Sequence, residues 1–325
     1  MHQPGYEQFT CNLCGSISSV SQDFYREGGA CSHCGSNVRF RALMYALSDH
    51  LYGKPLALTD FIANKDFKAM GLSDAKHYAV KLAELFDYTN FFYHTEPFLD
   101  ICNIDNSANN YYDLLVSSDV YEHVPPPRHI AFINSWHLLK PDGVLLLTVP
   151  YTSLPKTIEH YPTLYQYKIV SDEKGKLLVN RLRDLSFEVY DNLTWHGGEG
   201  STLEMRIFCE SDLLKILIDA GFKDVKIWNE DIPEFGIFQA HQGGGFVITA
   251  KKNGNAIPAP LTQHDPHLTN IYPQGETAGH FSKHIPNRIS GKRAERAIAK
   301  WAEEEGITIN KPSFFSKVLN YLKGR

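Results

Sequence analysis

The chain has 325 residues, of which 43% are hydrophobic, and its formal net charge is −5. This length and composition indicate a globular protein of two or three structural units, and the mildly acidic balance argues against a broad nucleic-acid-binding surface. No segment approaches the roughly 18 uninterrupted apolar residues that span a bilayer, and the first residues lack the basic and then apolar pattern of an export signal, so we expect a cytoplasmic protein.

Four of the six cysteines lie in the first 34 residues, as two C-x2-C pairs, CNLC and CSHC, each followed by a glycine that permits a tight knuckle. Two thiolate pairs at this spacing fit tetrahedral zinc with sulfur ligands. The alternatives are two disulfides, which a reducing compartment disfavours, and an iron–sulfur cluster, whose common spacings match less well. We therefore expect residues 1–38 to form a zinc ribbon with structural zinc on Cys11, Cys14, Cys31 and Cys34.

Residues 39–252 are expected to form an α/β domain. Residues 38–52 have helical spacing of apolar side chains, and Gly53 follows as a stop. Short apolar runs then alternate with amphipathic segments, which indicates a doubly wound, mostly parallel sheet with helices on both faces. The expected strands are PLALTDF (55–61), FKAMGL (67–72), NFFYH (90–94), YDLLVSS (112–118) and GVLLLTVP (143–150), and the expected helices between them cover 74–88 and 127–140.

Two further segments depart from this alternation. Residues 151–208 form an insertion rich in His, Tyr and Gly, which we interpret as a substrate lid or a β-hairpin extension. Residues 253–325 predict a linker and two short amphipathic helices, one around Trp301 and one around Leu319. These helices are expected to dock on the protein itself or on a second copy in a homo-oligomer. Contact of the last helix with a membrane surface is the alternative, because basic residues flank its aromatic face.

The order of these motifs resembles the class I S-adenosylmethionine-dependent methyltransferases over roughly residues 54–252. YDLLVSSDVYEHV followed by LLKPDG is similar to the fourth strand, helix and fifth strand of that family, and FVITAKK resembles its final reversed strand. The resemblance implies the cofactor S-adenosylmethionine. The stretches GLSDAKHYAVKLAELFDYTN, YHTEPFLDI and HGGEGSTLEMR also resemble a bacterial subgroup with a cysteine-rich amino terminus that we associate with glycan modification.

The resemblance implies roles for particular residues. In that family an acidic residue that ends the second strand holds the ribose hydroxyls of the cofactor, and the matching residue is Asp74; capping of the next helix is an equally good role for it. An acidic side chain after the third strand contacts the adenine amino group, and Asp100 is the best match, with Asp105 as a substitute. Ser118 and Asp119, at the end of the fourth strand, would face the methionine part or the acceptor.

One departure from the family concerns its first loop. The family normally has a glycine-rich turn after the first strand, where missing side chains let the cofactor approach the backbone. Here no glycine lies between Pro55 and Gly71. Asp60 and Asn64 are candidate replacements for the missing contacts. Either the loop has been rebuilt or cofactor binding has been lost.

Methyl transfer needs alignment of donor and acceptor and, for a hydroxyl acceptor, a base. Histidine is the usual base, and the candidates are His196 and His123, with His160 behind them; a structural role is the alternative for each. The residues that can hold a polar acceptor by hydrogen bonds are Glu199, Glu204, Arg206 and His160, with ordinary salt bridges as the alternative for the charged ones.

The leading hypothesis is therefore a methyltransferase that acts on an oxygen or nitrogen of a small polar acceptor, such as a sugar or nucleotide-sugar. A noncatalytic scaffold that has kept the fold is the first alternative. An RNA methyltransferase is the second. Residues 1–41 hold three arginines and three acidic residues, so they lack the basic excess that phosphate binding requires.

Overall fold

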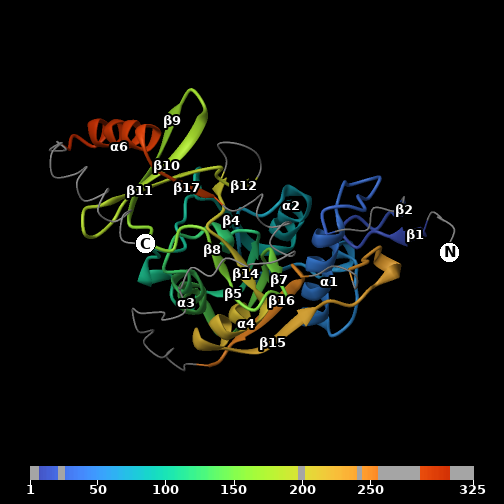
Figure 1. Cartoon of the computed structure of the whole chain (residues 1–325). Coiled ribbons are helices and arrows are strands. Elements are labelled where there is room, and N and C mark those ends of the chain that lie inside the picture. Colours follow the sequence, from blue (N-terminus) through green and yellow to red (C-terminus); the bar gives the residue numbers. More distant parts are fainter. Residues whose placement is uncertain (1–6, 21–25, 197–201, 240–243, 255–285, 308–325) are drawn as a thin grey trace. The chain divides into compact units, whose positions relative to one another are not determined.

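The computed structural model describes residues 7–20, 26–196, 202–239, 244–254 and 286–307, and divides the chain into two compact units. The first unit comprises Met1–Thr157 with Ile207–His264, and the second comprises Ile158–Arg206 with Asp265–Arg325. Figure 1 shows the helices and strands of both units. No helix in the described ranges combines the length and the apolar character needed to cross a membrane.

The first unit begins with the ribbon and a helix. Strands β1 (Glu7–Thr10) and β2 (Ile17–Val20) pair antiparallel. Helix α1 (Val38–Tyr52) starts where the Asn37 side chain accepts a hydrogen bond from the backbone N–H of Phe40 at 2.9 Å. It ends at Gly53, whose φ of 65° is left-handed. The helix predicted over 38–52 is thus confirmed.

A six-stranded sheet forms the centre of the first unit, in the order β15-β16-β6-β5-β3-β4. Its strands are β3 (Asn64–Leu72), β4 (Phe86–Phe91), β5 (Tyr112–Ser118), β6 (Leu139–Thr148), β15 (Phe222–Trp228) and β16 (Val247–Lys252). Neighbours among β4, β3, β5 and β6 run parallel. Strand β16 runs antiparallel to both β6 and β15, so it alone is reversed. This arrangement confirms the predicted sheet and its reversed last strand.

Helices cover both faces of this sheet (Figure 1). Alternate residues of a strand point to opposite faces, so the interior divides into two apolar clusters. Leu114 and Val116 of β5 pack in the cluster that holds α1 and α2 (Lys76–Leu85). Leu115 packs in the other cluster, with α3 (His129–Leu138) and α4 (Glu210–Asp219). The near-continuous apolar runs of the sequence follow from this double burial.

Short elements complete the first unit. Strand β7 (Tyr151–Thr152) pairs parallel with β14 (Arg206–Cys209) through Phe208 and Cys209. The 3₁₀ turns are η1 (Leu58–Asp60), η2 (Asn106–Ala108), η3 (Tyr121–His123) and η4 (Pro233–Phe235).

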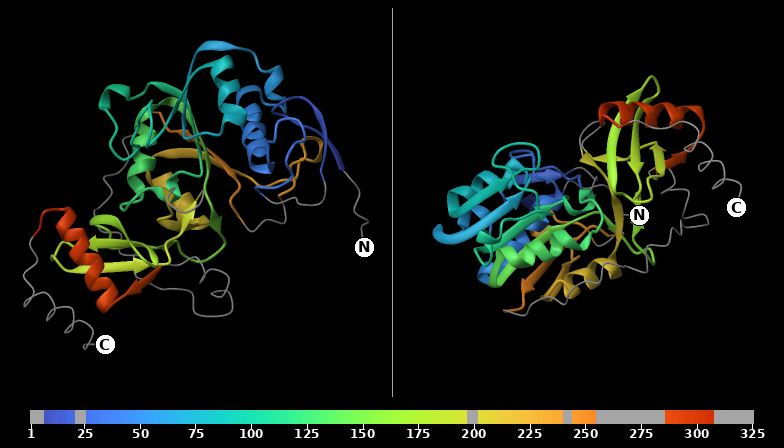
Figure 2. Two further views of the ribbon diagram at one scale, coloured as in Figure 1. Left: turned by 90° about the horizontal axis from the view of Figure 1, so that it is seen from above. Right: turned by 90° about the vertical axis from the view of Figure 1, so that its left-hand side faces the viewer.

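The second unit contains a four-stranded antiparallel sheet, β17-β11-β10-β9, with α6 (Lys292–Glu304) packed on it (Figure 2). The strands are β9 (Gln166–Asp172), β10 (Gly175–Arg181), β11 (Phe187–Asp191) and β17 (Asn287–Ile289); the short strands β8 (Ile158–Glu159), β12 (Trp195–His196) and β13 (Thr202–Leu203) also belong to the unit. Arg293 pairs with Asp172 and Asp191, both at 2.7 Å. The first C-terminal amphipathic helix therefore docks on the protein itself, whereas the second lies outside the described residues.

Two strand predictions are wrong. Residues 55–61 contain the turn η1 and no strand, because Leu58 and Phe61 pack with α1 and α2 instead of joining the sheet. The run NFFYH is not a strand as a whole, since β4 begins at Phe86 and ends at Phe91. The first strand of the six-stranded sheet is therefore β3, so Asp74 follows the first parallel strand and not the second.

Candidate functional site

The four cysteines of the ribbon converge on one point. Their sulfur atoms all lie within 4.8 Å of one another, with Cys11 Sγ 3.6 Å from Cys34 Sγ and Cys14 Sγ 3.8 Å from Cys31 Sγ. Zn–S bonds of about 2.3 Å in a tetrahedron place sulfurs about 3.8 Å apart, whereas a disulfide needs about 2.05 Å. All six cysteines are free. The donor set therefore fits zinc, as the sequence predicts, and excludes the two-disulfide alternative in this structure.

The two knuckles share one backbone design. Gly15 N–H donates to the Cys11 carbonyl at 2.8 Å, and Gly35 N–H donates to the Cys31 carbonyl at 2.9 Å. Both glycines have a φ of 73°, a left-handed conformation that side chains disfavour. The C-x2-C-G pattern thus builds the same turn twice and directs all four sulfurs inward.

A buried cation lies beside the cysteines. The Arg41 side chain is fully buried and donates to the carbonyls of Ser36 and Gly236, and its guanidinium stacks 4.5 Å from the ring centroid of Phe9. Its Nε has no partner among the described residues, and no described carboxylate pairs with it. Burial lowers the pKa of Arg41, and the negative thiolates of Cys11 and its neighbours oppose that shift. A buried charge needs compensation. Zinc with four thiolates carries a net charge of −2 and would supply it.

The second polar centre lies at the carboxyl edge of the six-stranded sheet, where ligands bind in sheets of this kind. Strand β5 ends at Ser118 and strand β6 at Thr148, and the two hydroxyls lie 3.0 Å apart. Asp119 follows with a left-handed φ of 56°. Its backbone N–H donates to the Thr148 carbonyl at 2.9 Å, and the Thr148 hydroxyl donates to Asp119 Oδ1 at 3.1 Å. The turn therefore fixes the carboxylate of Asp119 at the edge.

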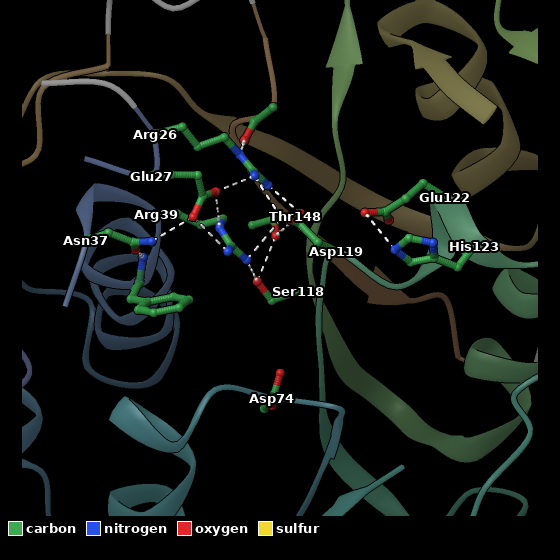
Figure 3. A network of polar contacts seen from close by, with 12 residues as sticks. Arg26, Glu27, Asn37, Arg39, Asp74, Ser118, Asp119, Glu122, His123 and Thr148 are labelled. Carbon is green, nitrogen blue, oxygen red and sulfur yellow. Dashed lines mark hydrogen bonds and ion pairs between the residues drawn. The ribbon is translucent and has the colours of Figure 1, made fainter. Parts of the chain in front are cut away.

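Two arginines from the amino-terminal part of the chain complete this centre (Figure 3). Arg26 Nη1 donates to Asp119 Oδ2 at 2.8 Å, Arg26 Nη2 donates to Asp119 Oδ1, and Arg26 Nε donates to the Gly245 carbonyl at 2.8 Å. Arg39, in the first turn of α1, lies 3.1 Å from Asp119 Oδ2 and donates to the Ser118 hydroxyl. Burial alone would raise the pKa of Asp119, but the charges of Arg26 and Arg39 outweigh it and hold that pKa at about 2.

Asp74 lies in the connection between β3 and α2. It is 4% exposed, and its carboxylate accepts hydrogen bonds from the hydroxyls of Tyr78 at 2.8 Å and Tyr88 at 2.7 Å. Burial raises the pKa of Asp74 to about 7 despite these two bonds. A Cβ at Gly71 would lie 2.0 Å from the Tyr88 hydroxyl, so only glycine fits there. The N-cap of α2 is Ala75, with no side-chain cap, so the capping role considered for Asp74 is wrong. Its cofactor role stays a prediction.

The other predicted residues of this unit have local partners. Asp100 Oδ1 accepts from the Cys102 backbone N–H at 2.9 Å, which stabilises its own turn. Asp105 Oδ1 likewise accepts from the Ser107 N–H at 2.9 Å. His123 Nε2 lies 3.7 Å from Oε1 of the fully buried Glu122 (Figure 3). Their assigned roles stay predictions.

Three of the predicted substrate residues take part in two separate pairs in the second unit. His160 Nε2 lies 2.8 Å from Glu204 Oε1, and Arg206 Nε donates to both carboxylate oxygens of Glu159 at 2.9 and 3.0 Å. All four side chains are buried, so these are interior pairs. For His196 the structure describes only the backbone, in β12, and Glu199 lies outside the described residues.

The arginine partners of Asp119 could not be predicted from the sequence. Arg26 and Arg39 belong to a segment whose net charge is zero, so no charge signal marks them. Thr148 could have been predicted as a site residue, because it is a polar residue at the end of an apolar strand, as Ser118 is. Arg41 had no such signal, because burial of an arginine cannot be inferred from its neighbours in sequence.

The order and directions of the six strands, with the single reversed strand β16, define a methyltransferase-like α/β fold. Similar solved structures include a Burkholderia thailandensis 1,6-didemethyltoxoflavin-N1-methyltransferase with bound S-adenosylhomocysteine, at 15% identity and a TM-score of 0.34, covering 65% of this chain and 78% of that chain. An S-adenosylmethionine-dependent methyltransferase from Clostridium acetobutylicum is similar at 14% identity and a TM-score of 0.31, covering 57% of this chain and 83% of that chain. One from Mesorhizobium loti is similar at 12% identity and a TM-score of 0.30, covering 56% of this chain and 80% of that chain. These scores assign no residue roles to this chain. Neither a protein-family model nor a curated protein matches the sequence.

Proposed function

We propose that this protein is an S-adenosylmethionine-dependent methyltransferase that methylates an oxygen or nitrogen of a small polar acceptor, such as a sugar or nucleotide-sugar, and that it carries structural zinc on its four cysteines. The observation that carries the proposal is the polar carboxyl edge of the sheet, where Ser118, Asp119 and Thr148 lie at the ends of β5 and β6. In a sheet of this order the ligand lies beyond those strand ends. Four thiolates leave no open position on zinc, so its role is structural.

The proposed chemistry is a displacement at an activated methyl group, which the cofactor supplies when it is bound. The protein's residues then have two tasks: to orient the acceptor and to remove its proton. His123, 3.7 Å from the Glu122 carboxylate, is the proposed base in the first unit. Glu122 would stabilise the imidazolium that forms when His123 accepts the proton, because the two groups lie within ion-pair distance.

Transfer of a labelled methyl group from S-adenosylmethionine to pools of sugars and nucleotide-sugars tests this proposal. Labelled product with the native protein, and a loss of about a hundredfold in rate for His123→Gln, would support it. His94→Gln is the control, since His94 lies on an exposed loop and contacts Tyr93. Equal rates for both variants would remove His123 from the mechanism, and no labelled product would count against the enzyme.

A noncatalytic scaffold is the second candidate, and one observation favours it. The acidic groups beyond β3 and β5 are already satisfied by the chain itself, Asp74 by two tyrosines and Asp119 by two arginines. Such pairing is what a fold that no longer binds a cofactor would need. A protein that binds neither S-adenosylmethionine nor S-adenosylhomocysteine would support this second candidate.

A further inference from the structure

The carboxylate of Glu27 lies among four N–H donors at the carboxyl edge of the sheet (Figure 3). Its Oε1 accepts from Arg26 Nη1 and from Arg39 Nε, each at 2.7 Å. Its Oε2 accepts from Arg39 Nη2 at 2.9 Å and from Asn37 Nδ2 at 2.7 Å. Two guanidinium groups and a carboxamide therefore converge on one anion.

These donors are held in place by groups other than Glu27. Arg26 is fixed by both oxygens of Asp119 and by the Gly245 carbonyl. Arg39 is fixed by Asp119 and by the Ser118 hydroxyl, through its Nη1. The side-chain Oδ1 of Asn37 accepts from the Phe40 backbone N–H and so caps α1, which orients the Asn37 amide group. The donors are thus held in position by other groups, mainly at the edge of the sheet, and Glu27 accepts their remaining N–H groups.

Glu27 is the most exposed member of this network. Its side chain is 43% exposed, whereas those of Arg26, Arg39 and Asp119 are 18%, 13% and 18% exposed. The two arginines are balanced by Asp119 and Glu27. Removal of Glu27 would leave one positive charge in excess and four N–H groups directed at the vacated position. The forked guanidinium group matches carboxylate and phosphate oxygens in pairs.

We propose that Glu27 is an internal occupant of an anion-binding position, and that this position takes a carboxylate or phosphate group of the acceptor. The anion position follows from the donors alone, and its assignment to the acceptor rests on the proposed function. The position adjoins Ser118 and Asp119, so an acceptor held there lies at the edge where the strands end. Entry of the acceptor displaces the Glu27 carboxylate from Arg26 and Arg39.

Calorimetric titration of the zinc-loaded full chain with inorganic phosphate tests the position itself. Glu27→Gln keeps the size of the side chain and removes the competing charge, so it is expected to bind phosphate about tenfold more tightly than the native protein, a difference of about 1.4 kcal/mol. Glu84→Gln, on α2 and paired with Lys81 at the surface, is the control and should behave as the native protein. Addition of Arg39→Gln to Glu27→Gln should abolish the gain.

Two results would overturn the anion position. One is no gain in Glu27→Gln while its thermal unfolding matches that of the native protein. The other is a gain that persists in the Glu27→Gln/Arg39→Gln double variant, which would indicate an adventitious ion only. If Glu27→Gln does not fold, Arg39→Gln alone serves as the test. It should weaken the phosphate binding of the native chain, and an unchanged affinity would reject the proposal.

A second pair of titrations separates the acceptor from the cofactor. S-adenosylhomocysteine carries a carboxylate, and 5′-methylthioadenosine lacks it. If Glu27→Gln strengthens binding of the first compound and not the second, the anion is the cofactor's own carboxylate, and the assignment to the acceptor is overturned. If phosphate binds Glu27→Gln but no variant binds S-adenosylhomocysteine, the proposed function fails while the anion position stands.

Discussion

Arg26 and Asp119 are 93 positions apart in the sequence and form a two-pronged ion pair, with Arg26 Nη1 2.8 Å from Asp119 Oδ2 and Arg26 Nη2 bonded to Oδ1. The pair joins the segment between the two cysteine knuckles to the carboxyl edge of the central sheet. The ribbon segment that holds Arg26 is therefore directly bonded to the carboxyl edge of the sheet. Zinc, which would hold the knuckles, would also hold the segment that contacts the edge.

Asp119→Asn should lower the free energy of unfolding by about 2 kcal/mol, because it removes one of the two carboxylates that Arg26 and Arg39 share and leaves only Glu27 to balance two partly buried charges. Asn tolerates the left-handed φ of this position, so backbone strain does not contribute. Asp142→Asn is a matched control: Asp142 also has a left-handed φ, of 64°, but its side chain is 72% exposed and pairs with Lys223 at the surface. Urea unfolding of both variants measures the difference. Equal small losses would show that the Asp119 pair contributes little.

The same carboxylate predicts a dependence of stability on pH. The pKa of Asp119 in the folded protein, about 2, lies below its ordinary value of 3.8. The folded state therefore favours the ionised form, and this contribution is fully present above about pH 4 and is lost as the pH falls toward 2. The difference in stability between the native protein and Asp119→Asn should be constant from pH 7 to 5 and should shrink below pH 4. A difference that stays constant down to pH 3 would contradict the assignment.

Arg41→Met should weaken zinc binding about tenfold or more, because the buried cation that offsets the thiolate charge is removed. Arg41→Lys should recover part of the affinity. Lys252→Met is the control: Lys252 is also a buried cation, 1% exposed and bonded to Asn110 and the Leu139 carbonyl, with no described carboxylate partner. Competition with a chelator measures the zinc affinity of the native protein and of the three variants, and Lys252→Met should match the native protein. The same affinity in Arg41→Met and in the native protein would show that Arg41 only ties backbone segments together.

Asp74→Asn should lower stability by less than about 1 kcal/mol, because burial already disfavours the ionised carboxylate, whose pKa is about 7, and an amide can accept from one tyrosine hydroxyl and donate to the other. Asp74 is 4% exposed and both of its oxygens accept tyrosine hydroxyls, so little of the carboxylate is accessible to a ligand. Binding of S-adenosylhomocysteine should therefore change by less than about threefold, within the range of indirect effects. A variant of native stability with affinity lowered about tenfold would instead support the ribose-binding role implied by the family resemblance.

The sequence predicted the main architecture because double burial leaves a clear pattern. The runs around Leu114 and Leu145 are apolar on both faces, and the residues after them turn polar where the sheet ends. The cysteine centre was predictable because four ligands and their glycines follow one another at fixed spacing. The strand predicted over residues 55–61 was wrong because a short apolar segment can pack against helices as well as in a sheet.

The polar contacts of the site were harder to predict. Arg26 and Arg39 contact Asp119 only in the folded chain. No local sequence pattern predicts a pair of residues so far apart in sequence. The partners of Asp74 are tyrosines that also fit an apolar interior, so their hydroxyls gave no signal. The family resemblance predicted roles for Ser118 and Asp119 at the end of the fourth strand, which stay predictions, and left the pairing of the charges there open.

Whether this protein binds the cofactor is tested by calorimetric titration of the purified, zinc-loaded protein with S-adenosylmethionine and S-adenosylhomocysteine. We expect binding at one site with micromolar affinity, near −8 kcal/mol. If the protein is well folded and neither compound gives detectable binding heat, the result would contradict the proposed methyltransferase function and would favour the noncatalytic scaffold.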